Sequence, residues 1–182
     1  MLSDALAREG EGHRLLLDGD AASAAKPLRE ASKLYRRSWE AAGPRSFGRL
    51  IGMVKCAVLA GDGAAQATYV MHELGDAADS PTGWYTLALA ALVAGDDDAA
   101  RRGAAAMREG GEAFERTAEA IDALAAADRD RYAAALAAIV RDFEARDRHV
   151  TGVAIADTAL VLQRVAEGRG MEAGVTSRLL PR

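Results

Sequence analysis

The stretch Ala57-Val58-Leu59-Ala60-Gly61-Asp62-Gly63-Ala64-Ala65 decides the fold, because similar stretches occur at three other places in the chain. These are residues 16–22, 92–100 and, in a more degenerate form, 124–130. In each, an apolar segment runs into a small residue, usually glycine, whose missing Cβ permits the left-handed conformation that ends a helix. The next residue is an aspartate, which can cap the following helix and complement its dipole. The stretch therefore predicts a helix, a tight turn and a second helix.

The spacing of these turns indicates a repeat. The residues before each aspartate, Gly19, Gly61, Gly95 and Ala127, are separated by 42, 34 and 32 residues, which is the period of helix-hairpin repeats. Apolar periodicity and stop signals predict helices at about residues 3–17, 24–42, 46–60, 62–74, 81–92, 98–110, 112–124, 130–144 and 150–168. We expect Ser3 to cap the first, and Pro27 either to delay the second or to kink it. The tail, residues 175–181, is expected to be extended, with its two leucines folding back onto the core.

The composition favours one all-α domain over residues 1–182. The 182 residues are 50% hydrophobic but only 5% aromatic, with four prolines. Alanine, leucine and valine therefore make up most of the apolar content, and no period-2 pattern of strands occurs. A chain of this length can bury one sizeable core. We expect a stack of antiparallel hairpins with about eight or nine helices.

The charge and the targeting signals of the sequence limit the kinds of partner and the compartment to be expected. The formal net charge is −4, and acidic and basic residues are interspersed, which argues against nucleic acid or an anionic membrane as partner. No apolar run approaches the about 20 residues of a membrane span. The N-terminus lacks the order of a signal peptide, and the single cysteine, Cys56, excludes an intrachain disulfide. We expect a cytoplasmic protein that is a monomer or a weak homodimer.

Helix pairs at this interval, with a small residue after each turn, resemble tetratricopeptide-like repeats. The aromatic and glycine signature of the first repeat helix is incomplete in every copy. The resemblance therefore implies an irregular stack of the tetratricopeptide-like type.

The C-terminal third is similar to the end of all-α immunity proteins of bacterial polymorphic-toxin systems, of the "immunity 49" type. The residues that carry this resemblance are Asp128–Phe143, His149-Val150-Thr151-Gly152-Val153, Ala156-Asp157, Leu160, Leu162, Ala166, Arg169-Gly170 and Ser177-Arg178-Leu179-Leu180-Pro181. The resemblance covers about a third of the chain and implies a bacterial immunity protein, part of a toxin–antitoxin pair, that binds a cognate toxin.

No pattern typical of a cofactor, a metal site or a catalytic centre occurs. The residues three before the histidines are Gly10, Tyr69 and Arg146, so the Glu-x-x-His pattern of di-iron bundles is missing. Zinc, redox, hydrolase and P-loop motifs are also missing. Lys55 beside Cys56 could lower the pKa of the thiol, but the apolar helix around Cys56 favours a packed structural cysteine.

The candidate partner-binding residues are aromatic and charged. Trp84 is the better core position of two adjacent aromatics, so Tyr85 is expected at the surface with Tyr69 and His72, where an amphipathic aromatic binds well. Asp96-Asp97-Asp98 could hold a cation or a basic partner, although a solvated helix start explains the run more simply. The set is completed by two arginines, Arg36 and Arg37.

We therefore expect a non-catalytic helical-repeat protein that acts by protein–protein interaction, most specifically an immunity protein that covers a toxin's active site. Two alternatives stay open. One is a regulatory or scaffolding module that captures a peptide or partner protein in its groove. The other is a small-molecule-binding or enzymatic helical domain that uses a pocket between hairpins.

Overall fold

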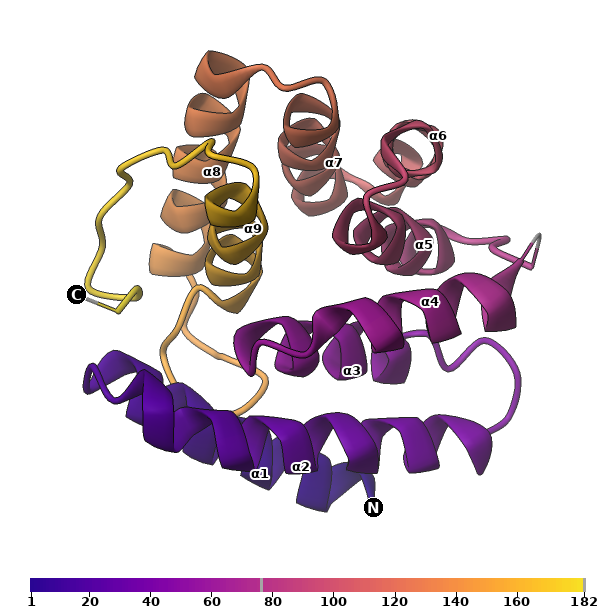
Figure 1. Cartoon of the computed structure of the whole chain (residues 1–182), viewed down its shortest axis with the longest axis vertical. Helices are drawn as coiled ribbons and strands as arrows, with labels where there is room; N and C mark the ends of the chain where they lie inside the picture. Colours follow the sequence, from indigo (N-terminus) through magenta and orange to yellow (C-terminus); the bar gives the residue numbers. More distant parts are fainter. Residues whose placement is uncertain (76, 182) are drawn as a thin grey trace.

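The computed structural model describes residues 1–75 and 77–181. Within these residues all regular secondary structure is helical, which confirms the all-α prediction (Figure 1). The elements are α1 (Leu2–Leu17), α2 (Ala21–Glu40), α3 (Gly48–Leu59), α4 (Gly63–Leu74), α5 (Pro81–Ala94), α6 (Asp97–Met107), η1 (Arg108–Gly110), α7 (Glu112–Ala125), α8 (Arg129–Glu144) and α9 (Asp157–Gly168). None of the helices in the described part of the chain has the length and apolarity needed to cross a membrane.

The repeated turns have the same backbone geometry at all four places. The residue before each aspartate has a positive φ, 81° at Gly19, 84° at Gly61, 84° at Gly95 and 54° at Ala127. The aspartate N–H then donates to the carbonyl oxygen five residues earlier, at 2.8–2.9 Å in every copy. This is the hydrogen bond that closes a left-handed helix end. The predicted helix–turn–helix units are therefore confirmed, including the degenerate fourth copy.

The aspartates cap the following helix in three of the four turns. The side chains of Asp20, Asp96 and Asp128 each accept a hydrogen bond from the backbone N–H three residues later, at 2.9–3.1 Å. Asp62 makes no such bond and forms an ion pair with Arg29 of α2 instead. The capping prediction is therefore wrong at Asp62, because a long-range partner competes for the carboxylate.

Three predicted helix starts differ from the structure. The N-cap of α1 is Met1 rather than Ser3, and the Met1 ammonium pairs with Asp4 at 2.8 Å. Capping by Asp20 starts α2 at Ala21, so Pro27 lies inside it. The last helix begins at Asp157 rather than near residue 150. The residues before it form a turn and an irregular segment instead, since Gly152 has a φ of 72° and its N–H donates to the His149 carbonyl oxygen; Val153 and Ile155 are buried in this segment.

Successive helices pack against one another from α1 to α8, and the first helices of neighbouring hairpins, α3, α5 and α7, also touch. The stack curls, so that α9 lies between α3 and α8 and packs against α3, α7 and α8 (Figure 1). The inner side of the curve is therefore covered by the chain's own last helix.

Close approach between helices uses glycine. A Cβ on Gly12 would lie 2.5 Å from Leu28, and one on Gly10 would lie 3.2 Å from the Thr151 carbonyl oxygen. These two glycines let α1 pack tightly against α2 on one side and against the segment before α9 on the other.

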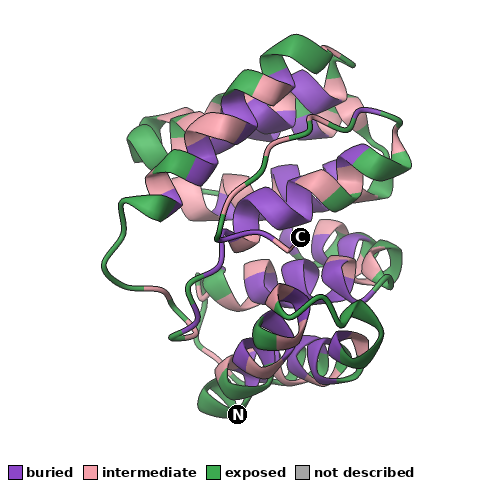
Figure 2. Cartoon of the chain, turned by 90° about the vertical axis from the view of Figure 1, so that its left-hand side faces the viewer, coloured by how far each residue is buried: buried purple, intermediate pink, exposed green. Residues whose placement is uncertain are grey.

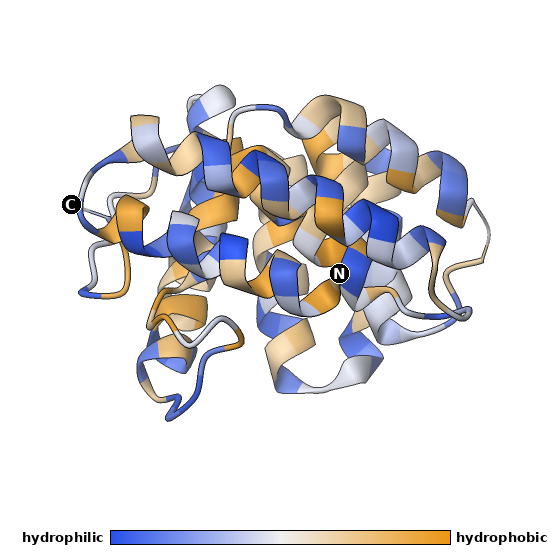
Figure 3. Cartoon of the chain, turned by 90° about the horizontal axis from the view of Figure 1, so that it is seen from below, coloured by the Kyte–Doolittle hydropathy of each residue, from blue (hydrophilic) through white to orange (hydrophobic). Residues whose placement is uncertain are grey.

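One cluster of buried residues extends from Ala5 to Leu180. Buried positions follow the facing sides of the helices (Figure 2). Leu179 and Leu180 are buried, and the Ala156 N–H donates to the Leu179 carbonyl oxygen at 2.9 Å, which confirms that the tail folds back. Seen from the side of α1 and α2, hydrophilic and hydrophobic positions are interspersed along each helix (Figure 3).

Candidate functional site

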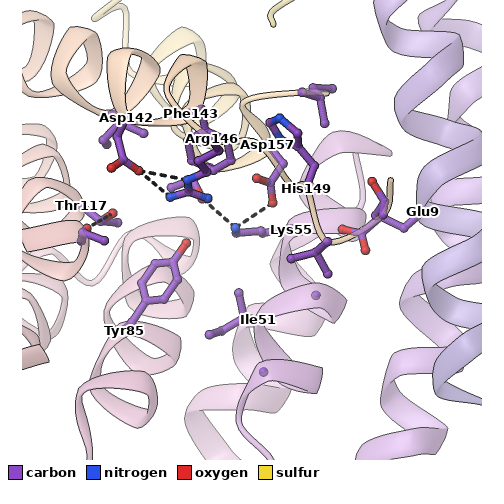
Figure 4. Close-up of a pocket in the computed structure, with 18 of the residues that line it drawn as sticks. Glu9, Ile51, Lys55, Tyr85, Thr117, Asp142, Phe143, Arg146, His149 and Asp157 are labelled. Carbon is purple, nitrogen blue, oxygen red and sulfur yellow. Dashed lines mark hydrogen bonds and ion pairs between the residues drawn. The ribbon is translucent and has the colours of Figure 1, made fainter. Parts of the chain in front are cut away.

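A pocket of about 420 Å³ lies on the inner side of the stack, and we call it the inner pocket. Most of its lining comes from the first helices α1, α3, α5 and α7, together with α8, the start of α9 and the segment 145–156 that joins these two helices. Figure 4 shows Ile51, Lys55 and Tyr85 reaching the pocket from below and Asp142 and Arg146 from above. The pocket therefore exists only because the stack curls and segment 145–156 crosses its opening.

The apolar part of the lining is contributed by several elements. It includes Ile51, Met107, Phe114, Ile139, Phe143, Val153 and Ile155. The Tyr85 and Phe114 rings meet edge to face, with centroids 6.3 Å apart. A small molecule with an apolar body thus finds aliphatic and aromatic contacts on several sides.

Lys55 is the central charged group of the inner pocket. Its side chain comes from the otherwise apolar helix α3 and is only 9% exposed. Nζ donates to Asp157 Oδ2 at 2.9 Å and to Thr158 Oγ1 at 2.7 Å. Burial by itself would lower the pKa of Lys55, but the Asp157 carboxylate, together with Tyr85 and Glu9, outweighs it and the pKa is raised. Burial likewise opposes ionisation of Asp157, and Lys55 nevertheless holds its pKa below the ordinary value. The pair is therefore charged.

Glu9 and His13, one turn apart on α1, form the second polar group of the lining. Both are buried, and Glu9 accepts a hydrogen bond from the Tyr35 hydroxyl at 2.6 Å. Burial raises the pKa of Glu9 despite that bond. Burial also lowers the pKa of His13 to about 4, so the imidazole is neutral at pH 7. His13 Nδ1 lies 3.3 Å from the Thr151 hydroxyl of segment 145–156.

Arginines surround the opening. Asp142 of α8 accepts from Arg116 of α7 at 2.5 Å and from Arg146 at 2.5 Å. The Arg146 guanidinium also lies over the Phe143 ring, 3.7 Å from its centroid. Arg148 lines the opening, is exposed, and forms no ion pair with any residue that the structure describes. The rim of the pocket is consequently basic in a chain whose net charge is −4.

Several buried polar atoms of the lining have no partner. Among the described residues, six buried side-chain nitrogen or oxygen atoms lack a hydrogen bond, and three belong to the inner pocket: His13 Nε2, Tyr85 OH and His149 Nδ1. Buried polar groups are normally hydrogen-bonded, because leaving one unpaired costs about 1–3 kcal/mol. Three such atoms around one pocket give it hydrogen-bonding capacity that none of the described residues uses.

Of the predicted surface residues, Arg36 and Tyr69 are in contact, and His72 lies one turn after Tyr69 on α4. The Arg36 guanidinium of α2 stacks on the Tyr69 ring of α4, 3.9 Å from its centroid. His72 follows Tyr69 by three residues on α4 and its side chain is 85% exposed. Arg37 is also exposed.

The predicted acidic run is used within the fold. Asp96 caps α6 by accepting from the Ala99 N–H, and Asp97 pairs with Arg169 at 2.7 Å. Asp98, in the first turn of α6, is exposed. These contacts favour the simpler of the two interpretations, a helix start.

Tyr85 differs from the sequence expectation. It lies in the inner pocket rather than on the outer surface, and its hydroxyl is buried. Trp84, its neighbour, is half-buried against the core. Cys56 is fully buried, and burial raises the pKa of its thiol well above the ordinary value. Lys55 therefore does not activate the thiol, and the packed structural role fits.

Sequence reasoning missed the residues that build the inner pocket, chiefly Glu9, His13, Lys55 and Asp157. One signal was present, because Lys55 interrupts a helix whose periodicity assigns its face to the core. A charge in such a place is buried only when it has a partner. No similar signal identified the partner, since Asp157 begins a helix where an acidic residue is ordinary.

The part of the chain that the structure describes contains no group of three or more His, Cys, Asp or Glu side chains placed to hold a metal ion. Comparison of the chain with protein-family models, with curated proteins and with solved structures found no match.

Proposed function

We propose that this protein is a binding protein for a small molecule, which it holds in the inner pocket. The observation that carries the proposal is the set of three buried, unpartnered polar atoms, on His13, Tyr85 and His149, around one pocket. The volume of about 420 Å³ lies within the roughly 300–1,000 Å³ of ligand sites. A mainly apolar lining with a few convergent polar groups is also typical of such sites.

The proposal is binding without catalysis. Asp157 is neutralised by Lys55, and Asp142 by two arginines. A general base needs a free carboxylate or imidazole near its substrate. Neither aspartate is free, and Cys56 lies outside the lining. Glu9 accepts from the Tyr35 hydroxyl, and the imidazoles of His13 and His149 would serve in this proposal as hydrogen-bonding groups for the ligand.

The test is a fragment screen by ligand-observed NMR, with neutral, cationic and anionic aromatic fragments, on the full chain and on Ile51→Trp. The Ile51 side chain points into the pocket (Figure 4), so a larger side chain fills it. We expect fragments to bind the wild-type chain and to lose binding in I51W. Thr68→Trp, on the exposed side of α4, is the matched control and should bind as the wild type does. If no fragment binds, or if I51W binds them equally, the pocket holds only water and the proposal fails.

A protein-binding role is a second candidate, supported by the Arg36–Tyr69 stack beside the exposed His72. Aromatic and arginine side chains dominate protein interfaces. Under this candidate, the protein neutralises a cognate toxin through the α2–α4 surface, because α9 covers the inner side where a repeat stack would hold a peptide. Co-purification with the product of the adjacent gene tests it. Tyr69→Ala should abolish capture and Thr68→Ala should not; no capture by the wild-type chain sinks the candidate.

A further inference from the structure

Each carboxylate of the inner pocket already accepts at least one hydrogen bond from a neighbouring side chain. The Asp157 carboxylate accepts from Lys55, and the Asp142 carboxylate accepts from Arg116 and Arg146. Glu9 accepts from the Tyr35 hydroxyl. A ligand that brought mainly donors would have to compete with these bonds.

The free capacity of the pocket includes several donors, beside the imidazole nitrogens of His13 and His149. Lys55 has three N–H groups and gives two of them to Asp157 and Thr158. The Tyr85 O–H is buried without a partner, and its ring lies 5.8 Å from Lys55 Nζ. At the rim, the Arg148 guanidinium forms no ion pair with a described residue. These three donors would be satisfied by acceptor oxygens.

The net charge of the lining also favours a ligand with acceptor oxygens. Four cationic side chains, Lys55, Arg116, Arg146 and Arg148, face three carboxylates, those of Glu9, Asp142 and Asp157. Burial also favours the neutral form of Glu9. The inner pocket thus has a positive balance inside an acidic protein, and its low-polarity walls strengthen the attraction for an anion.

We propose that the ligand of the inner pocket is a small organic acid, with a carboxylate or phosphate group on an apolar body. The acid oxygens accept hydrogen bonds from the Lys55 ammonium and the Tyr85 hydroxyl, which face one space (Figure 4). The apolar body contacts Ile51 and Phe114. Arg148 attracts the acid at the opening. This inference rests on the proposed small-molecule function and assigns the chemical class of the ligand.

The first experiment compares isosteric probes by isothermal titration calorimetry on the full chain. Phenylacetate and phenyl phosphate are the acids, phenylacetamide is the neutral probe and phenethylamine is the cationic one. We expect the acids to bind at least about tenfold more tightly than the amide, because hydrogen bonds between a cationic donor and an anionic acceptor are stronger than those to a neutral amide. Inorganic phosphate should bind more weakly than phenyl phosphate.

The outcomes separate the two proposals. If the amide or the amine binds as tightly as the acids and I51W abolishes that binding, the pocket is a ligand site but the organic-acid assignment is overturned. If inorganic phosphate equals phenyl phosphate, the apolar body is unused and the assignment is also overturned. If no probe binds, both proposals fail.

The second experiment uses Tyr85→Phe, which removes one hydroxyl and no packing. That hydroxyl makes no bond within the described chain, so Y85F should keep the unfolding midpoint and lose about tenfold in affinity for phenylacetate. Tyr132→Phe is the matched control, since the Tyr132 hydroxyl is also buried and unpartnered but lies outside the inner pocket. Equal affinities in Y85F, Y132F and the wild type would overturn the assignment.

The third experiment tests the rim. Arg148→Gln should weaken phenylacetate binding a few-fold and flatten its dependence on salt, because a surface charge acts through screened attraction. Arg102→Gln, at an exposed arginine of α6, is the control. An unchanged salt dependence in R148Q would remove Arg148 from the site.

Discussion

The four inter-helix turns and the inner pocket both contain polar groups that need hydrogen-bond partners. The partners are local in the turns and distant in sequence in the pocket. In each turn the aspartate N–H bonds to a carbonyl five residues back, and three of the aspartate side chains bond three residues ahead. In the pocket, Lys55 and Asp157 meet across 102 residues of sequence, and Tyr85 and His13 keep atoms with no partner among the described residues.

The turns therefore specify the fold, whereas the inner pocket belongs to the proposed function. A group satisfied by its sequence neighbours costs little to form and specifies the fold wherever the motif recurs. A buried polar group that tertiary packing leaves without a hydrogen-bond partner lowers the stability of the fold. Such a cost is typical of sites that await a ligand.

The largest expected effect comes from breaking the buried pair of the pocket. Lys55→Met leaves the Asp157 carboxylate without its cation in a buried place, and we expect a loss of about 3–5 kcal/mol in the free energy of unfolding. Denaturant unfolding measures it. The double variant Lys55→Met/Asp157→Leu should recover most of the loss, whereas a single variant as stable as the wild type would show that the pair is not buried in solution.

The next effect is a pH dependence from His13. Its pKa is about 4 in the folded chain, against an ordinary histidine value of 6.5, so the unfolded state binds the proton first as the pH falls. The stability contributed by the neutral imidazole is complete above pH 6.5 and is lost between pH 6.5 and 4, by up to about 3 kcal/mol.

His13→Gln isolates this effect, because Glu9 is present in both chains. The raised pKa of Glu9 acts in the opposite sense, since protonating it favours the folded state. We expect the free energy of unfolding, measured from about pH 7 down to about pH 4, to fall more steeply for the wild type than for H13Q. Parallel curves would contradict the buried neutral histidine.

A smaller effect distinguishes the regular turns from the degenerate one. Gly95→Ala adds a Cβ that meets no atom within 4 Å, so its cost is the backbone strain of a φ of 84°, about 1–2 kcal/mol. Ala127→Gly relieves the same strain and should stabilise the chain by up to about 1 kcal/mol. Thermal unfolding compares them, and the same sign for both variants would refute the shared turn geometry.

The smallest effect separates a capping aspartate from a non-capping one. Asp96→Ala removes an N-cap and should cost about 1 kcal/mol. Asp62→Ala removes a half-exposed ion pair with Arg29, worth about 0–1 kcal/mol. Chemical denaturation of both variants should therefore rank D96A as the less stable; the reverse order would give Asp62 the larger structural role.

The turns were predictable from the sequence because every residue that sets their geometry lies within a few positions. Gly61 adopts the positive φ that ends one helix, and Asp62 is the next residue in the chain. The same local reasoning placed the last helix too early, since Val150, Val153 and Ile155 mimic helical spacing. Val153 and Ile155 are instead buried in the irregular segment that precedes α9 and lines the pocket.

The inner pocket was not predictable because it depends on the curl of the whole stack. Glu9, Lys55, Tyr85 and Asp157 come from four helices, and no periodicity relates their positions. Tyr85 shows this most clearly, because the sequence predicted it on the outer surface and it lies in the inner pocket. Its neighbour Trp84 occupies less of the core than its size suggested.

The return of α9 to α3 also orders the folding reaction. Hairpins from α1 to α8 close short loops and can form between chain neighbours, whereas docking α9 on α3 closes a loop of about a hundred residues and has a higher entropic cost. The inner pocket is therefore complete only once this long-range contact has formed. A molecule that binds there would stabilise the docked state selectively, so its concentration would set the fraction of chains in which the final helix is in place.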